Sequence, residues 1–124
     1  MIHLDTNFLI RALRFGSDED KRLRAWLNAN EEVGVSAMTW AEFLCGPLHP
    51  GDREAAELLF PNVEPLSPAD AVKGAVLFNA TGRRSRSLAD CLIAAVALRL
   101  GARVATGNHS DFEPFLSHGL VLAE

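Results

Sequence analysis

The stretch SLADCLIAAVALRL, residues 87–100, predicts the clearest helix of the chain and decides its fold class. From Leu88 to Leu98, ten of the eleven residues are apolar, and the exception is Asp90. A helix that is apolar nearly all round is a buried helix, and Gly101 is a typical residue to end it. Because a predicted strand, Arg103-Val104-Ala105, follows at once, the chain places a buried helix next to a sheet.

The same alternation of short strands and helices extends over the rest of the sequence. Glycine and proline residues separate the apolar periods, as in Gly16-Ser17 and Gly46-Pro47. This alternation predicts an α/β layer structure with a mainly parallel sheet, and 124 residues fit a single domain spanning 1–124. The predicted strands are 2–4, 34–36, 103–105 and 120–122, with another starting at Val63, and the predicted helices are 6–13, 20–28, 37–45, 52–60, 68–80, 87–100 and 112–116.

The composition is that of an ordinary globular protein. Hydrophobic residues make up 48% and charged residues 23% of the chain. Charges at Asp90 and Arg99 interrupt the longest apolar stretches, which are too short to span a membrane. The first residues lack the basic start and apolar run of a signal peptide. We therefore expect a soluble, cytoplasmic protein without a membrane segment.

The charges are unevenly distributed along the chain. The formal net charge is −4, which by itself argues weakly against nucleic acid as a partner. From 83 to 103, however, there are five arginines and one acid, whereas from 51 to 70 there are five acids and one arginine. We expect Arg83, Arg84 and Arg86 to contact RNA phosphate, and the alternative is a solubilising loop.

Two aspartates lie in apolar surroundings where a carboxylate is costly to bury. Asp90 falls in the first turn of the predicted 87–100 helix, on what the pattern indicates is a buried face. The alternative is a favourable charge effect at a helix N-terminus. Asp5 follows the first predicted strand, and ligands of parallel α/β sheets bind at that edge. Its alternative is an N-cap of the next helix.

Glu42 is a third acid among apolar neighbours. Thr39-x-x-Glu42 matches a capping box, in which the glutamate bonds back to the start of its helix. If that helix begins at Ser36 instead, Glu42 lies past the capping position. Both interpretations stay open at this point.

Three acids that converge without a cation would repel one another. Mg²⁺ binds through one or two carboxylates and keeps several waters, and Mn²⁺ takes similar ligands. The four histidines lack zinc-site spacing, and neither a glycine-rich phosphate loop nor a G-x-S-x-G elbow is found. A Mg²⁺ or Mn²⁺ site remains, and its natural reaction is phosphodiester hydrolysis.

Four segments resemble, in order, the acidic motifs of PIN domains. They span nearly the whole chain, so the ordered set is more specific than any one motif. Compact bacterial chains of this kind resemble VapC-type toxins of toxin–antitoxin pairs. The segments are MIHLDTNFLI (1–10), Ser36-x-x-Thr39-x-x-Glu42, SLADCLIAA (87–95) and ATGNHSDF (105–112).

The resemblance implies an α/β/α sandwich, endoribonuclease activity with Mg²⁺ or Mn²⁺, a homodimer, and a cognate antitoxin whose C-terminal segment crosses the active site. It assigns the principal catalytic and metal-binding roles to Asp5, Glu42 and Asp90. Many relatives have an acid where this chain has Asn108, so Asp111 is the fourth candidate, either catalytic or orienting Asn108 or a water. Supporting hydrogen-bond roles fall to Thr6, Asn7, Thr106 and Asn108.

Two other functions are compatible with an α/β domain of this size. One is a non-catalytic PIN-like module that binds RNA or protein, although none of its three principal acids is lost here. The other is a metal-dependent phosphatase acting on small molecules, although Asn7 stands where an Asp-x-Asp motif would need an acid. We also expect Phe8, Leu13, Trp26 and Leu27 either to form a groove for an antitoxin helix or to belong to the core.

Overall fold

The computed structural model describes residues 1–84 and 87–124 and contains a parallel sheet at its centre. The sheet has four strands in the order β2-β1-β3-β4, and every pairing is parallel. His3 of β1 pairs with Gly34 on one side and with Val104 on the other. The strands are β1 Ile2–Leu4, β2 Val33–Gly34, β3 Arg103–Ala105 and β4 Val121–Leu122.

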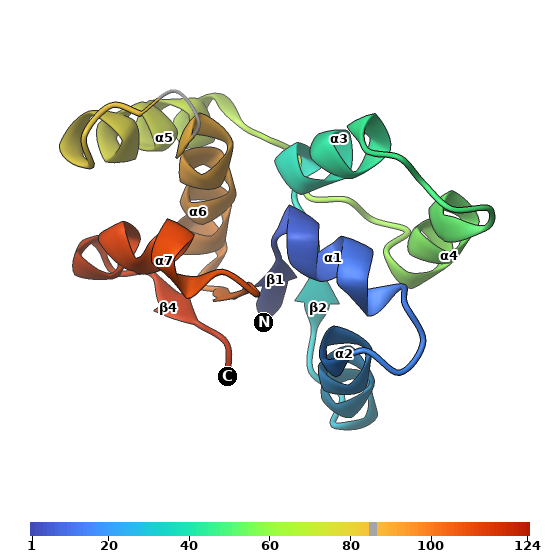
Figure 1. Ribbon diagram of the computed structural model, residues 1–124. Helices are drawn as coiled ribbons and strands as arrows, with labels where there is room; N and C mark the ends of the chain where they lie inside the picture. Colours follow the sequence, from blue (N-terminus) through green and yellow to red (C-terminus); the bar gives the residue numbers. More distant parts are fainter. Residues whose placement is uncertain (85–86) are drawn as a thin grey trace.

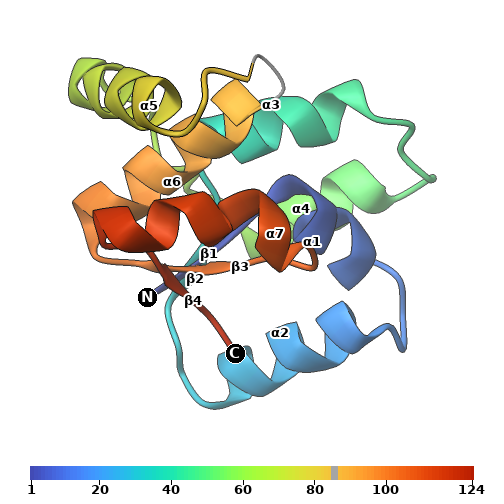
Figure 2. The ribbon, with the colours of Figure 1, turned by 60° about the vertical axis from the view of Figure 1, so that its left-hand side comes forward.

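Helices flank the sheet on both sides. Figure 2 shows α2 on one side of the strands and α5 and α6 on the other. This arrangement confirms the predicted α/β/α class with a parallel central sheet. The helices are α1 Thr6–Ala12, α2 Asp18–Asn28, α3 Ala37–Cys45, α4 Asp52–Leu59, α5 Pro68–Ala80, α6 Leu88–Leu100 and α7 His109–Phe112, and a 3₁₀ helix, η2, follows over Glu113–His118.

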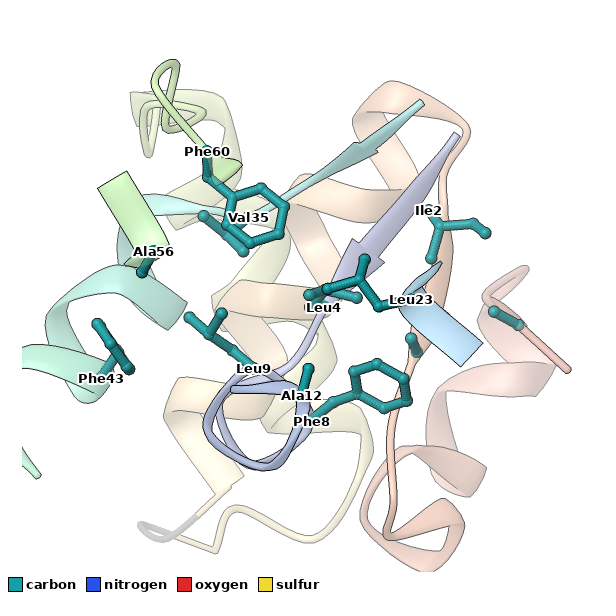
Figure 3. Packing of buried hydrophobic residues seen from close by; sticks show 12 residues of the cluster. Ile2, Leu4, Phe8, Leu9, Ala12, Leu23, Val35, Phe43, Ala56 and Phe60 are labelled. Atoms are coloured by element: carbon teal, nitrogen blue, oxygen red, sulfur yellow. The ribbon is translucent and has the colours of Figure 1, made fainter. Parts of the chain in front are cut away.

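Two groups of buried apolar side chains fill the space between the layers. The first joins Ile2 and Leu4 of β1 to side chains of α1 to α4, and Figure 3 shows Leu4 near Leu9 in this group. The second joins Val104 of β3 to α5, α6 and the α7–η2 segment. Alternate residues of a strand point to opposite faces, so a short sheet contributes to both groups.

Helix α6 is buried as the apolar stretch predicts. Its residues Ile93, Ala94 and Val96 are at most 1% exposed, and Gly101 ends it with φ of 66°. The neighbouring α5 approaches closely at Gly74, where an added Cβ would lie 2.6 Å from Leu92 Cδ2. Figure 1 shows α5 and α6 side by side at one end of the molecule.

A partly buried ion pair also connects these two helices. Arg99 of α6 donates to both carboxylate oxygens of Asp70 on α5, at 2.9 and 3.0 Å, and bonds Glu64 at 3.0 Å. Asp70 also accepts from the Ser67 amide in the capping box that starts α5. The pair therefore fixes the start of α5 against the last turn of α6.

Several predicted boundaries differ from the observed ones. Helix α2 begins at Asp18 rather than at 20, because Ser17 caps it by accepting from the Asp20 amide. Strand β2 is Val33–Gly34 rather than 34–36, because Ser36 leaves the sheet to cap α3. The strand expected from Val63 is an isolated bridge between Glu64 and Ser36.

The C-terminal part differs in the same way. In place of the helix predicted over 112–116, the structure has a short α7 over His109–Phe112 followed by the 3₁₀ helix η2. Pro114 lies in the first turn of η2 and lacks a backbone donor, so α7 does not continue through it. Strand β4 is one residue shorter than predicted. No helix in the part of the chain that the structure describes is long and apolar enough to cross a membrane.

Candidate active site

The carboxyl ends of the parallel strands bring distant residues to one edge of the sheet. Asp5 follows β1 and Thr106 follows β3, and the Asp5 amide donates to the Ala105 carbonyl at 3.0 Å. On the other side of β1, Thr39 Oγ1 donates to the Leu4 carbonyl at 3.1 Å, which holds α3 against this edge. The three motif segments that follow β1, β2 and β3 therefore meet here.

Asp5 combines the two roles that the sequence left open. It is the N-cap of α1, and its Oδ1 accepts from the Phe8 amide at 2.8 Å. Its side chain is also buried at the sheet edge. Burial raises the pKa of Asp5 and nearby Asp111 and Glu42 raise it further, while the Thr106 hydroxyl and the Phe8 amide oppose this shift.

Glu42 lies past the capping position of its helix. Helix α3 is capped by Ser36, whose hydroxyl accepts from the Thr39 amide at 3.2 Å. The capping-box alternative for Glu42 is therefore wrong, because Thr39 is already inside the helix. Instead, Glu42 Oε1 accepts a 2.6 Å hydrogen bond from Thr6 Oγ1. This contact gives Thr6 a side-chain role beside the acids.

Asp90 is half-buried in the first turn of α6. Burial and the charges of Asp111, Glu42 and Asp5 raise its pKa from an ordinary value of 3.8 to about 7. A helix N-terminus favours the charged form of a carboxylate, so the other acids and the burial outweigh the helix effect. The same four carboxylates thus share one electrostatic environment.

Asp111 belongs to this group, although it is exposed. The loop before it is organised by Thr106, which is buried and whose Oγ1 accepts from the Asn108 amide at 3.0 Å. The Asn108 side-chain oxygen accepts from Ser110 Oγ at 2.6 Å. Asn108 therefore shapes the loop, while Asp111 adds the fourth charge. Asn7, also exposed, lies in the first turn of α1.

The oxygen chemistry of these acids suits a hard divalent cation, but their side chains are not closed around a common point. Among residues 1–84 and 87–124, no group of three or more His, Cys, Asp or Glu side chains is placed to hold a metal ion. Instead, one oxygen of Glu42 accepts from Thr6, and one oxygen of Asp5 accepts from the Phe8 amide.

A cleft of about 340 Å³ opens beside Asp90 and Asp111. Arg84 is part of its lining, whereas Arg83 is exposed in a left-handed conformation with φ of 56°. Arg86, the third arginine predicted to contact RNA, lies outside the described residues. Thr81 and Ser110 also line the cleft. The sequence did not single them out, because Thr81 lies outside the four motif segments and Ser110, although inside the fourth, is not one of its acidic or supporting positions.

Acids gathered at the carboxyl edge of a parallel sheet suit a hydrolase that acts on phosphate esters. The family model named PIN domain matches residues 2–113, and the chain belongs to this family. The comparison supports a toxin ribonuclease of the VapC type, as the ordered motifs predicted. Among curated proteins, no match to the chain is found.

Solved structures of toxin–antitoxin systems are similar over the whole chain. FitAcB from Neisseria gonorrhoeae is 27% identical, with 99% of this chain and 97% of that chain covered and a TM-score of 0.72. VapBC-1 from nontypeable Haemophilus influenzae is 25% identical, with 100% and 98% covered and a TM-score of 0.70. VapBC2 from Rickettsia felis, solved with a promoter DNA fragment, is 20% identical and shares the fold, with 99% and 98% covered and a TM-score of 0.75.

Proposed function

We propose that this protein is a Mg²⁺- or Mn²⁺-dependent endoribonuclease and the toxin of a type II toxin–antitoxin pair. The observation that carries the proposal is the convergence of acids at the carboxyl edge of the sheet: Asp5 follows β1, Glu42 bonds the neighbouring Thr6, and Asp90 and Asp111 line one cleft. Such a group is unfavourable unless a cation or a proton neutralises it. Membership of the PIN family and the similarity to FitAcB and VapBC-1 support the same function.

In this proposal Asp5, Glu42 and Asp90 hold the divalent ion. When bound, the ion supplies positive charge that offsets the phosphate and lowers the pKa of a water molecule. The residues of the chain orient the acids: the Phe8 amide fixes one oxygen of Asp5, and the Thr6 hydroxyl fixes one oxygen of Glu42. Asp111 lies on the exposed side of the group, where it orients water or substrate.

A cleavage assay on two substrates separates the candidate functions. Wild type with Mg²⁺ should cut labelled single-stranded RNA and leave a small phosphate ester intact. Asp90→Asn should lower RNA cleavage by at least about a hundredfold, because losing a metal ligand costs more than losing a supporting residue. Asp18→Asn, an exposed aspartate at the start of α2, is the matched control and should retain activity.

The alternatives give other results in this assay. Hydrolysis of the ester without cleavage of RNA would indicate a phosphatase. Binding of RNA without cleavage would indicate a non-catalytic PIN module. Either outcome would overturn the proposed activity.

We infer that the antitoxin docks in a second groove, on the side of α1, α2 and α4. The groove measures about 300 Å³ and is lined by apolar side chains that include Leu13, Phe15, Leu27 and Leu59. Phe15 is 90% exposed, and such apolar surface is typical of a docking site for an amphipathic helix. The similarity to FitAcB and VapBC-1 supports a protein partner here.

The aromatic residues expected in this groove belong mainly to the core. Phe8 is fully buried, so its assignment to a docking surface is wrong. Trp26 is partly buried and stacks on Phe8 with ring centroids 5.6 Å apart. Leu13 and Leu27 do line the groove. The homodimer implied by the family resemblance stays a prediction.

A further inference from the structure

The hydroxyl groups that line the cleft beside Asp90 already donate their protons to the protein. The three hydrogen bonds run from Thr81 Oγ1 to the Leu77 carbonyl (2.7 Å), from Ser87 Oγ to the Arg84 carbonyl (2.7 Å) and from Ser110 Oγ to the Asn108 side-chain oxygen (2.6 Å). A hydroxyl has one proton and two lone pairs. These side chains therefore offer hydrogen-bond acceptors to a ligand.

The rest of the lining extends this pattern. The carboxylates of Asp90 and Asp111 add acceptors, and Arg84 is the cationic side chain of the lining. Pro114 and Phe115 contribute apolar surface. A volume of about 340 Å³ lies within the range of small-molecule sites, and a mixture of apolar walls and a few polar groups is typical of them.

The backbone of Arg84 is held by hydrogen bonds just before the start of α6. Its carbonyl accepts both from Ser87 Oγ at 2.7 Å and from the Ser87 amide at 2.9 Å. These two contacts hold the Arg84 carbonyl against Ser87, the N-cap of α6 and itself a lining residue of the cleft. A guanidinium group in this place suits a phosphate, because its planar fork can form paired hydrogen bonds with phosphate oxygens.

We propose that this cleft is the subsite for a nucleotide that flanks the scissile phosphate and that it selects a base with an exocyclic amine. The proposal rests on the endoribonuclease function above. Arg84 binds a phosphate, and the acceptor-lined wall receives amine protons. Cytosine presents an amine where uracil presents a carbonyl oxygen. Uracil would therefore place its carbonyl oxygen against the acceptor oxygens of the cleft wall. Neither side could donate a hydrogen bond, so these polar groups would stay unpaired.

Cleavage of a single-stranded RNA library with randomised positions tests base selection without knowledge of the natural substrate. The cut ends from wild type with Mg²⁺ are sequenced. At one position flanking the cut, we expect cytosine to be used about fivefold more often than uracil, the effect of roughly one hydrogen bond. In Thr81→Val and in Ser110→Ala, this ratio should fall to about twofold.

Equal use of cytosine and uracil by wild type at both flanking positions would overturn the proposal. A ratio unchanged in both variants would overturn it as well, and each variant is checked for folding by its unfolding curve. If wild type cuts no RNA at all, the proposed endoribonuclease function fails too. The two failures are thus distinguishable.

The arginines provide a matched pair for the phosphate contact. Arg84→Gln should raise KM for a cleaved RNA about five- to tenfold with little change in base preference, because a charge-assisted hydrogen bond is lost. Arg83→Gln removes the same charge one residue away, outside the lining, and should change KM by less than about twofold. Equal effects of the two changes would contradict a specific role for Arg84.

Discussion

At the scale of single residues, two acids of the candidate site also take part in local structure. Asp5 caps α1, and Glu42 accepts from Thr6. These contacts explain why sequence patterns gave each acid a plausible structural role: for Asp5 that role is real, and for Glu42 it is replaced by the contact with Thr6. Asp5, Glu42 and Asp90 stand out in the sequence because each lies in an apolar segment, whereas the contact between Glu42 and Thr6 joins residues 36 positions apart and could not be predicted.

Two substitutions separate the capping and charge roles of Asp5. Asp5→Asn should keep the cap, since asparagine is a good N-cap residue, whereas Asp5→Ala should lose it. We expect Asp5→Ala to be about 1 kcal/mol less stable than Asp5→Asn in urea unfolding, while both variants lose RNA cleavage. Equal stability of the two variants would show that the bond to the Phe8 amide contributes nothing.

The raised pKa of Asp90 makes stability depend on pH. The pKa rises from 3.8 to about 7 on folding, so the folded protein holds a proton that the unfolded chain releases. Protonation of Asp90 therefore contributes fully to the free energy of unfolding below pH 3.8. This contribution is lost as the pH rises toward 7. Without metal, wild type should lose about 2 kcal/mol more than Asp90→Asn between pH 5 and 8.

Urea unfolding in EDTA at these two pH values measures the difference. Adding Mn²⁺ at pH 8 should stabilise wild type more than the variant, because the ion replaces the proton as the neutralising charge. The same pH dependence in wild type and Asp90→Asn would contradict the assigned environment of Asp90.

At the scale of helices and strands, apolar periodicity predicted which elements exist better than where they end. The 87–100 helix is observed as α6 over Leu88–Leu100, because burial on all sides leaves an unmistakable pattern. Strand β2 has only two residues, and its end is set by Ser36 turning to cap α3. The cap at Ser36 is a local contact that the sequence offered as an alternative, whereas the bridge to Glu64 joins distant segments and is not visible in local sequence.

The ion pair between α5 and α6 should contribute more to stability than an exposed pair. Asp70→Ala removes two bonds to Arg99 and one to the Ser67 amide, and Asp70 is 1% exposed. We expect a loss of about 2–3 kcal/mol in the free energy of unfolding, somewhat less than for a fully buried pair, because Arg99 keeps Glu64 and contact with water.

The matched control is Glu57→Ala, which breaks an exposed pair with Arg53 on α4. Its cost should be within about 0.5 kcal/mol. Similar losses for the two variants would mean that the α5–α6 ion pair does not stabilise the fold beyond an ordinary surface pair.

At the scale of the whole molecule, two surfaces with different chemistry share α1 and otherwise lie on different elements. The acidic edge involves the segments after β1 and β3 with α3 and α6, whereas the apolar groove involves α1, α2 and α4. Figure 1 shows α2 and α4 at the opposite side of the molecule from α5 and α6. A partner that occupies the groove therefore needs an additional segment to reach the acids, and a cationic residue such as arginine could neutralise them there.

Antitoxin binding should depend on the groove and not on neighbouring apolar residues. Leu59→Asp changes a groove residue, and Leu58→Asp changes an 84% exposed neighbour on the same helix that does not line the groove. We expect Leu59→Asp to weaken binding of the purified antitoxin at least about tenfold with RNA cleavage retained, and Leu58→Asp to bind as wild type. Calorimetry measures both, and undiminished binding by Leu59→Asp would place the antitoxin elsewhere.

We propose above that the four acids act through a divalent cation. The most direct measurement is cleavage of a labelled single-stranded RNA by wild type first stripped with EDTA and then supplied with Mn²⁺. We predict no cleavage in EDTA, recovery on addition of Mn²⁺, and no recovery in Asp90→Asn under the same conditions. Cleavage that continues unchanged in EDTA would contradict metal-dependent catalysis, because the acids would then act without a divalent ion.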